Sequence, residues 1–182
     1  MKTHITRRIL TWEILGCLFI LVLGTLLHFA FEWSGFWNPS AVFCPVNESV
    51  WEHLKMGFWP VILLAIIQFG QLRKAGPNFI LAKTCSLYLI PLIILVLFYT
   101  YTGIIGYNIL WADILTFVIA TIIGQYVSYR ILLSRRSSPF LNCLAVLAII
   151  AAIYAFAFFT YHPAKIPLFK DSSTGKYGIL YK

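Results

Sequence analysis

The stretch "ILTWEILGCLFILVLGTLLHFAF", residues 9–31, decides the fold class of this chain. Glu13 is its one residue among Asp, Glu, Lys and Arg, and the stretch exceeds the roughly 20 apolar residues that a helix needs to cross a hydrocarbon core ~30 Å thick. A basic segment, "MKTHITRR", precedes it as in a secretory signal peptide, but the run ends in "LLHFAFEW" without a small-x-small cleavage site. We therefore expect a retained transmembrane helix.

The remainder of the chain repeats this apolar pattern. Of its 182 residues 60% are hydrophobic and 11% are charged, which is not the composition of a soluble domain. The sequence predicts an all-α fold class, a polytopic integral membrane bundle of about five transmembrane helices over residues 1–160. The predicted spans cover about residues 9–31, 52–72, 78–102, 108–131 and 139–160.

The orientation in the membrane is predicted from Lys and Arg, which favour cytoplasmic loops. Loops 32–51 and 103–107 contain neither residue type. The opposite ends of the spans carry three cationic groups: Lys2, Arg7 and Arg8; Arg73 and Lys74; Arg130, Arg135 and Arg136. We expect a multi-pass cell-membrane protein with a cytoplasmic N-terminus and an extracytoplasmic C-terminus, although the tail contains Lys165, Lys170, Lys176 and Lys182.

This topology accounts for most of the net charge of +8, together with attraction to anionic lipid. The lipid bilayer is therefore the expected partner. We do not expect nucleic-acid binding, and the sequence indicates no particular protein partner.

Acids and histidines gather where the spans meet the outer face. His28 and Glu32 end the first span, and the motif "PVNESVWEHLK", residues 45–55, opens the second with two acids and a histidine. The polar candidates at this face are His28, Glu32, Glu48, Glu52, His53, Asp113 and His162. Such residues are expensive near hydrocarbon, so this face is the predicted functional site.

One interpretation of the group is a metal site. His28 and Glu32 are four residues apart, as are Glu48 and Glu52, and that spacing places each pair on one helix face. Imidazole with carboxylate oxygen suits a divalent metal such as zinc or manganese. We predict His28, Glu48, Glu52 and His53 as ligands, Glu32 and Glu48 as catalytic carboxylates, and Asp113 and His162 as further polar candidates.

Structural roles compete with this interpretation. Ser49 and Glu52 have the spacing of a capping box, which would occupy Glu52 at a helix start. His28 and Asp113 are equally compatible with interhelical hydrogen bonds. Glu13 and Lys83 lie near the inner ends of their spans and are expected to form a structural pair.

Cysteines and common motifs add little chemistry. Cys17, Cys85 and Cys143 are placed at membrane depth, and Cys44 is the predicted exposed thiol. Neither a CxxC nor a phosphate-binding or standard hydrolase motif is present in the sequence.

The tail, residues 161–182, is too polar to span a membrane. Turn residues in "DSSTG" separate two short segments of extended character, which predicts a small hairpin or lid over the outer face.

Three segments, "HFAFEWSG", "PVNESVWEHLK" and "PLFKDSSTGKYG", carry a resemblance that runs along the chain. The sequence resembles a family of small bacterial multi-span membrane proteins classed as a domain of unknown function, with the Asn-Glu-Ser-x-x-Glu-His run as its most specific part. The resemblance implies a helical membrane protein and no established activity.

Three functions remain open from the sequence. The first is a metal-dependent hydrolase acting on a lipid or peptide at the outer leaflet. The second is a small proton- or cation-coupled carrier that uses Asp113. The third is a non-catalytic membrane subunit or scaffold, in which the polar residues only form hydrogen bonds.

Overall fold

The computed structural model describes residues 2–73, 77–134 and 138–180. Its helices are α1 (Lys2–Trp33), η1 (Asn38–Val42), α2 (Val50–Leu72), α3 (Phe79–Ile105), α4 (Leu110–Leu133), α5 (Pro139–Tyr161) and η2 (Pro167–Phe169). Each α-helix is long and apolar enough to cross a membrane. The predicted all-α bundle of five transmembrane helices is therefore confirmed. Four cations of the orientation prediction lie outside the described residues: Lys74, Arg135, Arg136 and Lys182.

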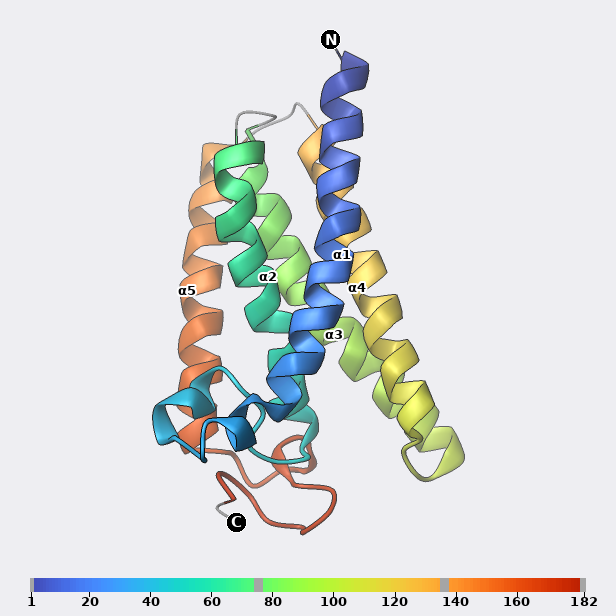
Figure 1. The fold of residues 1–182 in the computed structure, drawn as a ribbon, viewed down its shortest axis with the longest axis vertical. Coiled ribbons are helices and arrows are strands. Elements are labelled where there is room, and N and C mark those ends of the chain that lie inside the picture. Colours follow the sequence, from blue (N-terminus) through green and yellow to red (C-terminus); the bar gives the residue numbers. More distant parts are fainter. Residues whose placement is uncertain (1, 74–76, 135–137, 181–182) are drawn as a thin grey trace.

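The helices alternate in direction, so N- and C-termini lie at opposite ends of the bundle (Figure 1). The loop between α1 and α2, which contains η1, and the segment after α5 both cover the end where the C-terminus lies. We call this the tail end. Here α3 and α4 lean away from α2 and α5, so the bundle is more open at the tail end than at the other (Figure 1).

Close packing in the middle of the bundle depends on two glycines around Ile90 of α3. A Cβ atom on Gly57 of α2 would lie 2.6 Å from Ile90, and one on Gly124 of α4 would lie 2.5 Å from it. Small residues let helix backbones approach in this way, and such van der Waals packing drives helix association in lipid. Ile90 itself is fully buried, so α2, α3 and α4 are held together in the middle of the bundle, away from the open tail end.

Two ion pairs are closed inside the helix bundle. Lys83 Nζ lies 2.5 Å from Glu13 Oε1, with both residues 3% exposed, so the predicted pair is present. The second pair, Lys55 and Glu52, lies at the tail end of α2, again with 2.5 Å between Nζ and Oε2.

The prediction of Cys44 as an exposed thiol is wrong. Cys44 is 5% exposed and packs with Phe31, Ala41 and Val46 under the α1–α2 loop. This burial also raises the pKa of its thiol. The loop folds back over the helix ends and covers this thiol. The absence of Lys and Arg from the loop predicts only its side of the membrane, not how it folds.

Candidate metal centre

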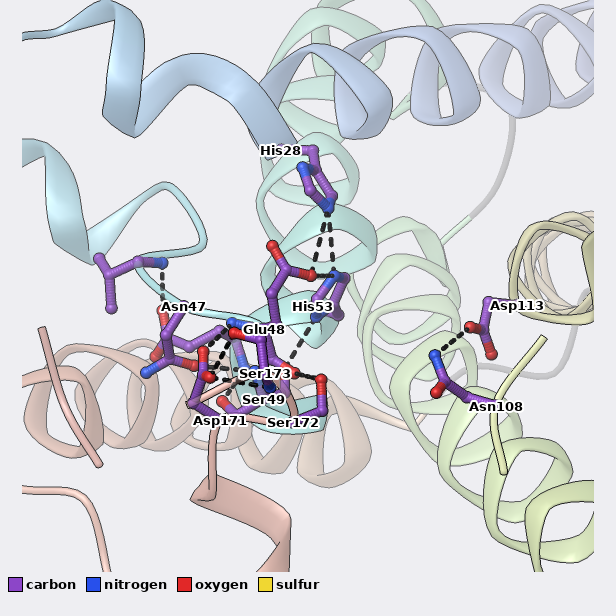
Figure 2. A network of polar contacts seen from close by, with 12 residues as sticks. His28, Asn47, Glu48, Ser49, His53, Asn108, Asp113, Asp171, Ser172 and Ser173 are labelled. Carbon is purple, nitrogen blue, oxygen red and sulfur yellow. Dashed lines mark hydrogen bonds and ion pairs between the residues drawn. The ribbon is translucent and has the colours of Figure 1, made fainter. Parts of the chain in front are cut away.

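Three side chains from separate parts of the chain converge at the tail end. His28 comes from the last turns of α1, Glu48 from the loop before α2, and His53 from the first turn of α2 (Figure 2). His53 Nε2 lies 3.2 Å from His28 Nε2 and 3.4 Å from Glu48 Oε2, and His28 Nε2 lies 3.9 Å from the same oxygen. All three ligand atoms therefore lie within 4.8 Å of one another.

The orientation of His53 is fixed by its own helix. Ser49 is the N-cap residue of α2, and its hydroxyl accepts a hydrogen bond from the Glu52 amide at 3.4 Å. The Ser49 carbonyl lies 2.8 Å from His53 Nδ1, so a protonated Nδ1 donates to it. A neutral His53 held in this way presents the lone pair of Nε2 to His28 and Glu48, as a metal-ligating histidine does when its other nitrogen donates to a carbonyl.

The electrostatics of the cluster favour a cation. When Nε2 of His53 carries a proton, it donates to Glu48, and this hydrogen bond together with the charge of the imidazoles holds the pKa of Glu48 below its ordinary value, against its partial burial and the charge of Asp171. Glu48 is therefore a carboxylate at neutral pH, and its Oε2 faces two imidazole nitrogens. Two lone pairs and an anionic oxygen at this separation repel one another unless a proton or a metal ion lies between them.

Glu48 is positioned by the tail. Its amide donates to Asp171 Oδ2 at 2.8 Å, and its carbonyl accepts from the Ser172 hydroxyl at 3.1 Å. Asn47 is also tied to the tail, since its side-chain amide donates to the Gly178 carbonyl at 2.8 Å. The backbone on both sides of the Glu48 side chain is thus held by residues more than 120 positions further along the chain.

Asp171 is a strong acceptor at this junction. Burial raises its pKa, but hydrogen bonds from the Glu48 amide and from Ser173 and Thr174 outweigh burial and bring the pKa to about 2. The residues of "DSSTG" form the predicted turn around this carboxylate, and the described tail contains only one isolated bridge, between Lys170 and Tyr177. The sequence indicated the turn and gave no sign of the contact with Glu48.

Glu52, a predicted ligand, is directed elsewhere. Its Oε2 accepts from the Val46 amide at 3.1 Å and from Lys55, and Lys55 also donates to the Ala41 carbonyl at 2.7 Å. Ser49 caps the helix as expected. In a capping box its own amide would donate to the Glu52 side chain, but here that amide donates to Asn47 Oδ1. Glu52 thus fastens the α1–α2 loop to α2 and lies outside the His28, Glu48 and His53 cluster.

A cavity of about 640 Å³ opens beside the cluster, between α1, α2, α3, α4 and the tail. Its volume is that of a typical small-molecule site. His28, Glu48 and His53 line one part of it, Lys170 and Ser172 of the tail another, and Asn108 and Asp113 a third. Most of the remaining wall is apolar: Phe29, Val50, Met56, Ile94, Phe98, Leu110, Ile114 and Phe117.

Asp113 is the one other predicted candidate that lines this cavity. It accepts a hydrogen bond from the Tyr101 hydroxyl. It accepts another, at 3.4 Å, from the Asn108 side chain (Figure 2). It is close enough to His53 to interact with it electrostatically. Glu32 and His162 are exposed and do not line the cavity, and His162 stacks on Phe158 at 4.9 Å.

Comparisons with known proteins add one finding. The family model described as "Family of unknown function (DUF6512)" matches residues 1–179. No curated protein and no solved structure matches the chain. The expectation of an uncharacterised family is confirmed, whereas the bacterial origin and the family-wide motif stay predictions.

Proposed function

The chain belongs to DUF6512, a family of unknown function, and from this premise we propose that it is a membrane-embedded hydrolase that uses a divalent metal ion. The observation that carries the proposal is the convergence of His28, Glu48 and His53 within 4.8 Å at the edge of a cavity. Two imidazoles and one carboxylate are a common ligand set of catalytic zinc, which keeps a further position for water. Manganese accepts the same donors.

The chemistry follows from the open side of the cluster. His28 and His53 expose 32% of their side chains and Glu48 exposes 50%, so a water molecule and a substrate can reach an ion held there. A divalent metal lowers the pKa of bound water and polarises an ester, amide or phosphoryl oxygen. Asp113 lines the same cavity, which makes it a better candidate for the general base than Glu32.

The membrane side of the site is part of the proposal. The cationic groups of the sequence favour the end opposite the tail as cytoplasmic, which assigns the cluster to the outer leaflet. A lipid or a peptide at that leaflet is then the substrate.

The carrier remains the second candidate because of a specific contact. The two Nε2 atoms lie 3.2 Å apart, a distance at which imidazoles share a proton. Further along the bundle, buried polar atoms without a hydrogen-bond partner among the described residues belong to Gln68, Thr121 and Gln125. A proton path would need polar groups of this kind.

Metal analysis of the purified protein separates these candidates. We expect the zinc-loaded protein to retain about one ion per chain after gel filtration, and His28→Ala or His53→Ala to lose it. His162→Ala is the matched control, since His162 lies at the same end of the bundle but outside the cluster. A wild-type protein that retains no divalent metal would contradict the hydrolase and leave the carrier or the scaffold.

A further inference from the structure

We propose that the cavity binds an amphiphile whose acyl chain lies along the apolar wall and whose phosphate-bearing headgroup contacts Lys170. This inference rests on the proposed function in that the headgroup then lies beside His28, Glu48 and His53, and it names the substrate class of that site. The observation that carries it is the division of one cavity into a long apolar wall and a polar end with a single lining cation among the described residues.

The long wall of the cavity is mostly apolar in composition, and two of its hydroxyl groups are already hydrogen-bonded within their own helices. Three threonines line it. The Thr25 hydroxyl donates to the Leu21 carbonyl at 2.8 Å and the Thr102 hydroxyl donates to the Phe98 carbonyl at 2.7 Å, so these two protons are used within their own helices. Thr116 is 6% exposed. The wall beside them presents methyl, methylene and ring surfaces.

These surfaces favour an acyl chain over a peptide. The backbone groups of transmembrane helices bond internally and offer no edge for an extended peptide to pair with. A peptide bound here would bury its own amides without partners, which is costly in an apolar setting. A hydrocarbon chain has no such groups to satisfy.

An acyl chain can reach the cavity directly from the bilayer, because several wall residues are also exposed on the surface of the bundle. Phe29 of α1 is 46% exposed, and Leu110 and Ile114 of α4 are 68% and 44% exposed. These residues belong to segments that are long and apolar enough to lie in a membrane. The cavity wall is thus continuous with the lipid-facing surface of the bundle, and a chain can enter sideways between α1 and α4.

Lys170 supplies the charge at the polar end. It is exposed, belongs to the tail and lines the cavity together with Ser172. Lysine is a common ligand of phosphate, and a divalent metal at the neighbouring cluster would attract the same anion. Lys and Arg generally favour the cytoplasmic side, whereas Lys170 lies on the predicted outer side. Binding of a phosphate headgroup would explain this exception.

Photocrosslinking tests this site with a defined probe. Lauroyl lysophosphatidate with a diazirine near the chain end is added to the protein in phosphatidylcholine nanodiscs, both zinc-loaded and after chelation. We expect crosslinks on α1 and α4 wall residues, competed about tenfold better by unlabelled lauroyl lysophosphatidate than by monolauroyl glycerol. Inorganic phosphate should not compete, because it lacks the chain.

Two matched pairs of variants locate the contacts. Lys170→Ala should abolish the preference for the phosphate headgroup, whereas Lys165→Ala, an exposed lysine of the same tail outside the cavity, should keep it. Ile114→Trp should block crosslinking, whereas Ile122→Trp, an exposed position further along α4, should not.

Each outcome decides one claim. Equal competition by the neutral lipid, equal effects of Lys170→Ala and Lys165→Ala, or better competition by an apolar peptide would overturn the amphiphile site. If chelated and zinc-loaded protein discriminate equally and the wild type retains no zinc, the amphiphile site stands and the hydrolase fails. If the wild type retains zinc but does not discriminate between the headgroups, the amphiphile site fails and the metal site stands.

Discussion

Two clusters of charged side chains lie at opposite ends of the helix bundle, and they differ in how their charges are balanced. Glu13 and Lys83 form a pair in which a carboxylate meets an ammonium 2.5 Å away, with both residues 3% exposed. At the tail end Glu48 meets His28 and His53, whose neutral forms bring no charge, beside a cavity. In the first cluster the two opposite charges neutralise each other, which accounts for a structural role. The second has no charged partner of its own among these side chains, and for this reason we propose it as the binding site for a cation.

The largest expected loss of stability comes from removing one partner of the Glu13 and Lys83 ion pair. Lys83→Met leaves the Glu13 carboxylate buried without its partner, and loss of one partner of a buried ion pair costs about 3–5 kcal/mol. The double variant Glu13→Gln, Lys83→Met should recover most of this loss, because neither charge remains. Thermal unfolding in detergent measures both. An unchanged melting temperature in Lys83→Met would contradict the structural role.

The open cluster should respond in the opposite way. His53→Ala should lower zinc affinity by at least about 100-fold, because it removes a ligand, while changing the free energy of unfolding of the metal-free protein by less than about 1 kcal/mol. Competition with a zinc-sensitive dye gives the affinity, and unfolding in the presence of chelator gives the stability. Equal losses of stability in His53→Ala and Lys83→Met would remove the distinction between the two clusters.

The tail should act on the proposed metal site through Glu48. Asp171→Asn weakens the acceptor that holds the Glu48 amide, and loss of a group that orients a ligand lowers metal affinity by about 10-fold. Lys176→Ala, an exposed change in the same turn, serves as the control. Zinc titration of both variants checks this, and wild-type affinity in Asp171→Asn would show that the tail does not position Glu48.

The smallest expected effect is at the helix start. Ser49→Ala removes the cap of α2 and should cost about 0.5–2 kcal/mol in thermal unfolding. Ser49→Asp keeps a capping oxygen and should retain most of the stability. Because the Ser49 carbonyl that orients His53 is a backbone group, zinc affinity should stay within about threefold of wild type in both variants. A larger loss would place Ser49 in the metal site.

The fold was predictable because its signal is local. Each span contains an apolar run of membrane length, so the number and type of helices followed from the length and hydropathy of these runs. The pairing of Glu13 with Lys83 was predictable from their depth in the membrane, since both residues lie near the inner ends of their spans. Burial of Cys44 did not follow, because it depends on how the α1–α2 loop folds back.

The site was predictable only in part. His28, Glu48 and His53 were among the candidates, but helix spacing grouped Glu48 with Glu52, and α2 begins at Val50, after Glu48. The two carboxylates consequently meet different partners. The Asp171 contact to Glu48 joins residues 123 positions apart, and no local pattern encodes such a contact.

X-ray absorption at the zinc edge of the zinc-loaded protein tests the central claim most directly. A site made by His28, His53 and Glu48 predicts two imidazole nitrogens at about 2.0–2.1 Å and oxygen from carboxylate and water, without sulfur. The imidazole scattering should fall by about half, as one of two such ligands is lost, in His53→Ala that is forced to bind zinc at high concentration. An all-oxygen shell, a sulfur shell, or a spectrum unchanged by His53→Ala would contradict the assignment of these three residues as a metal centre.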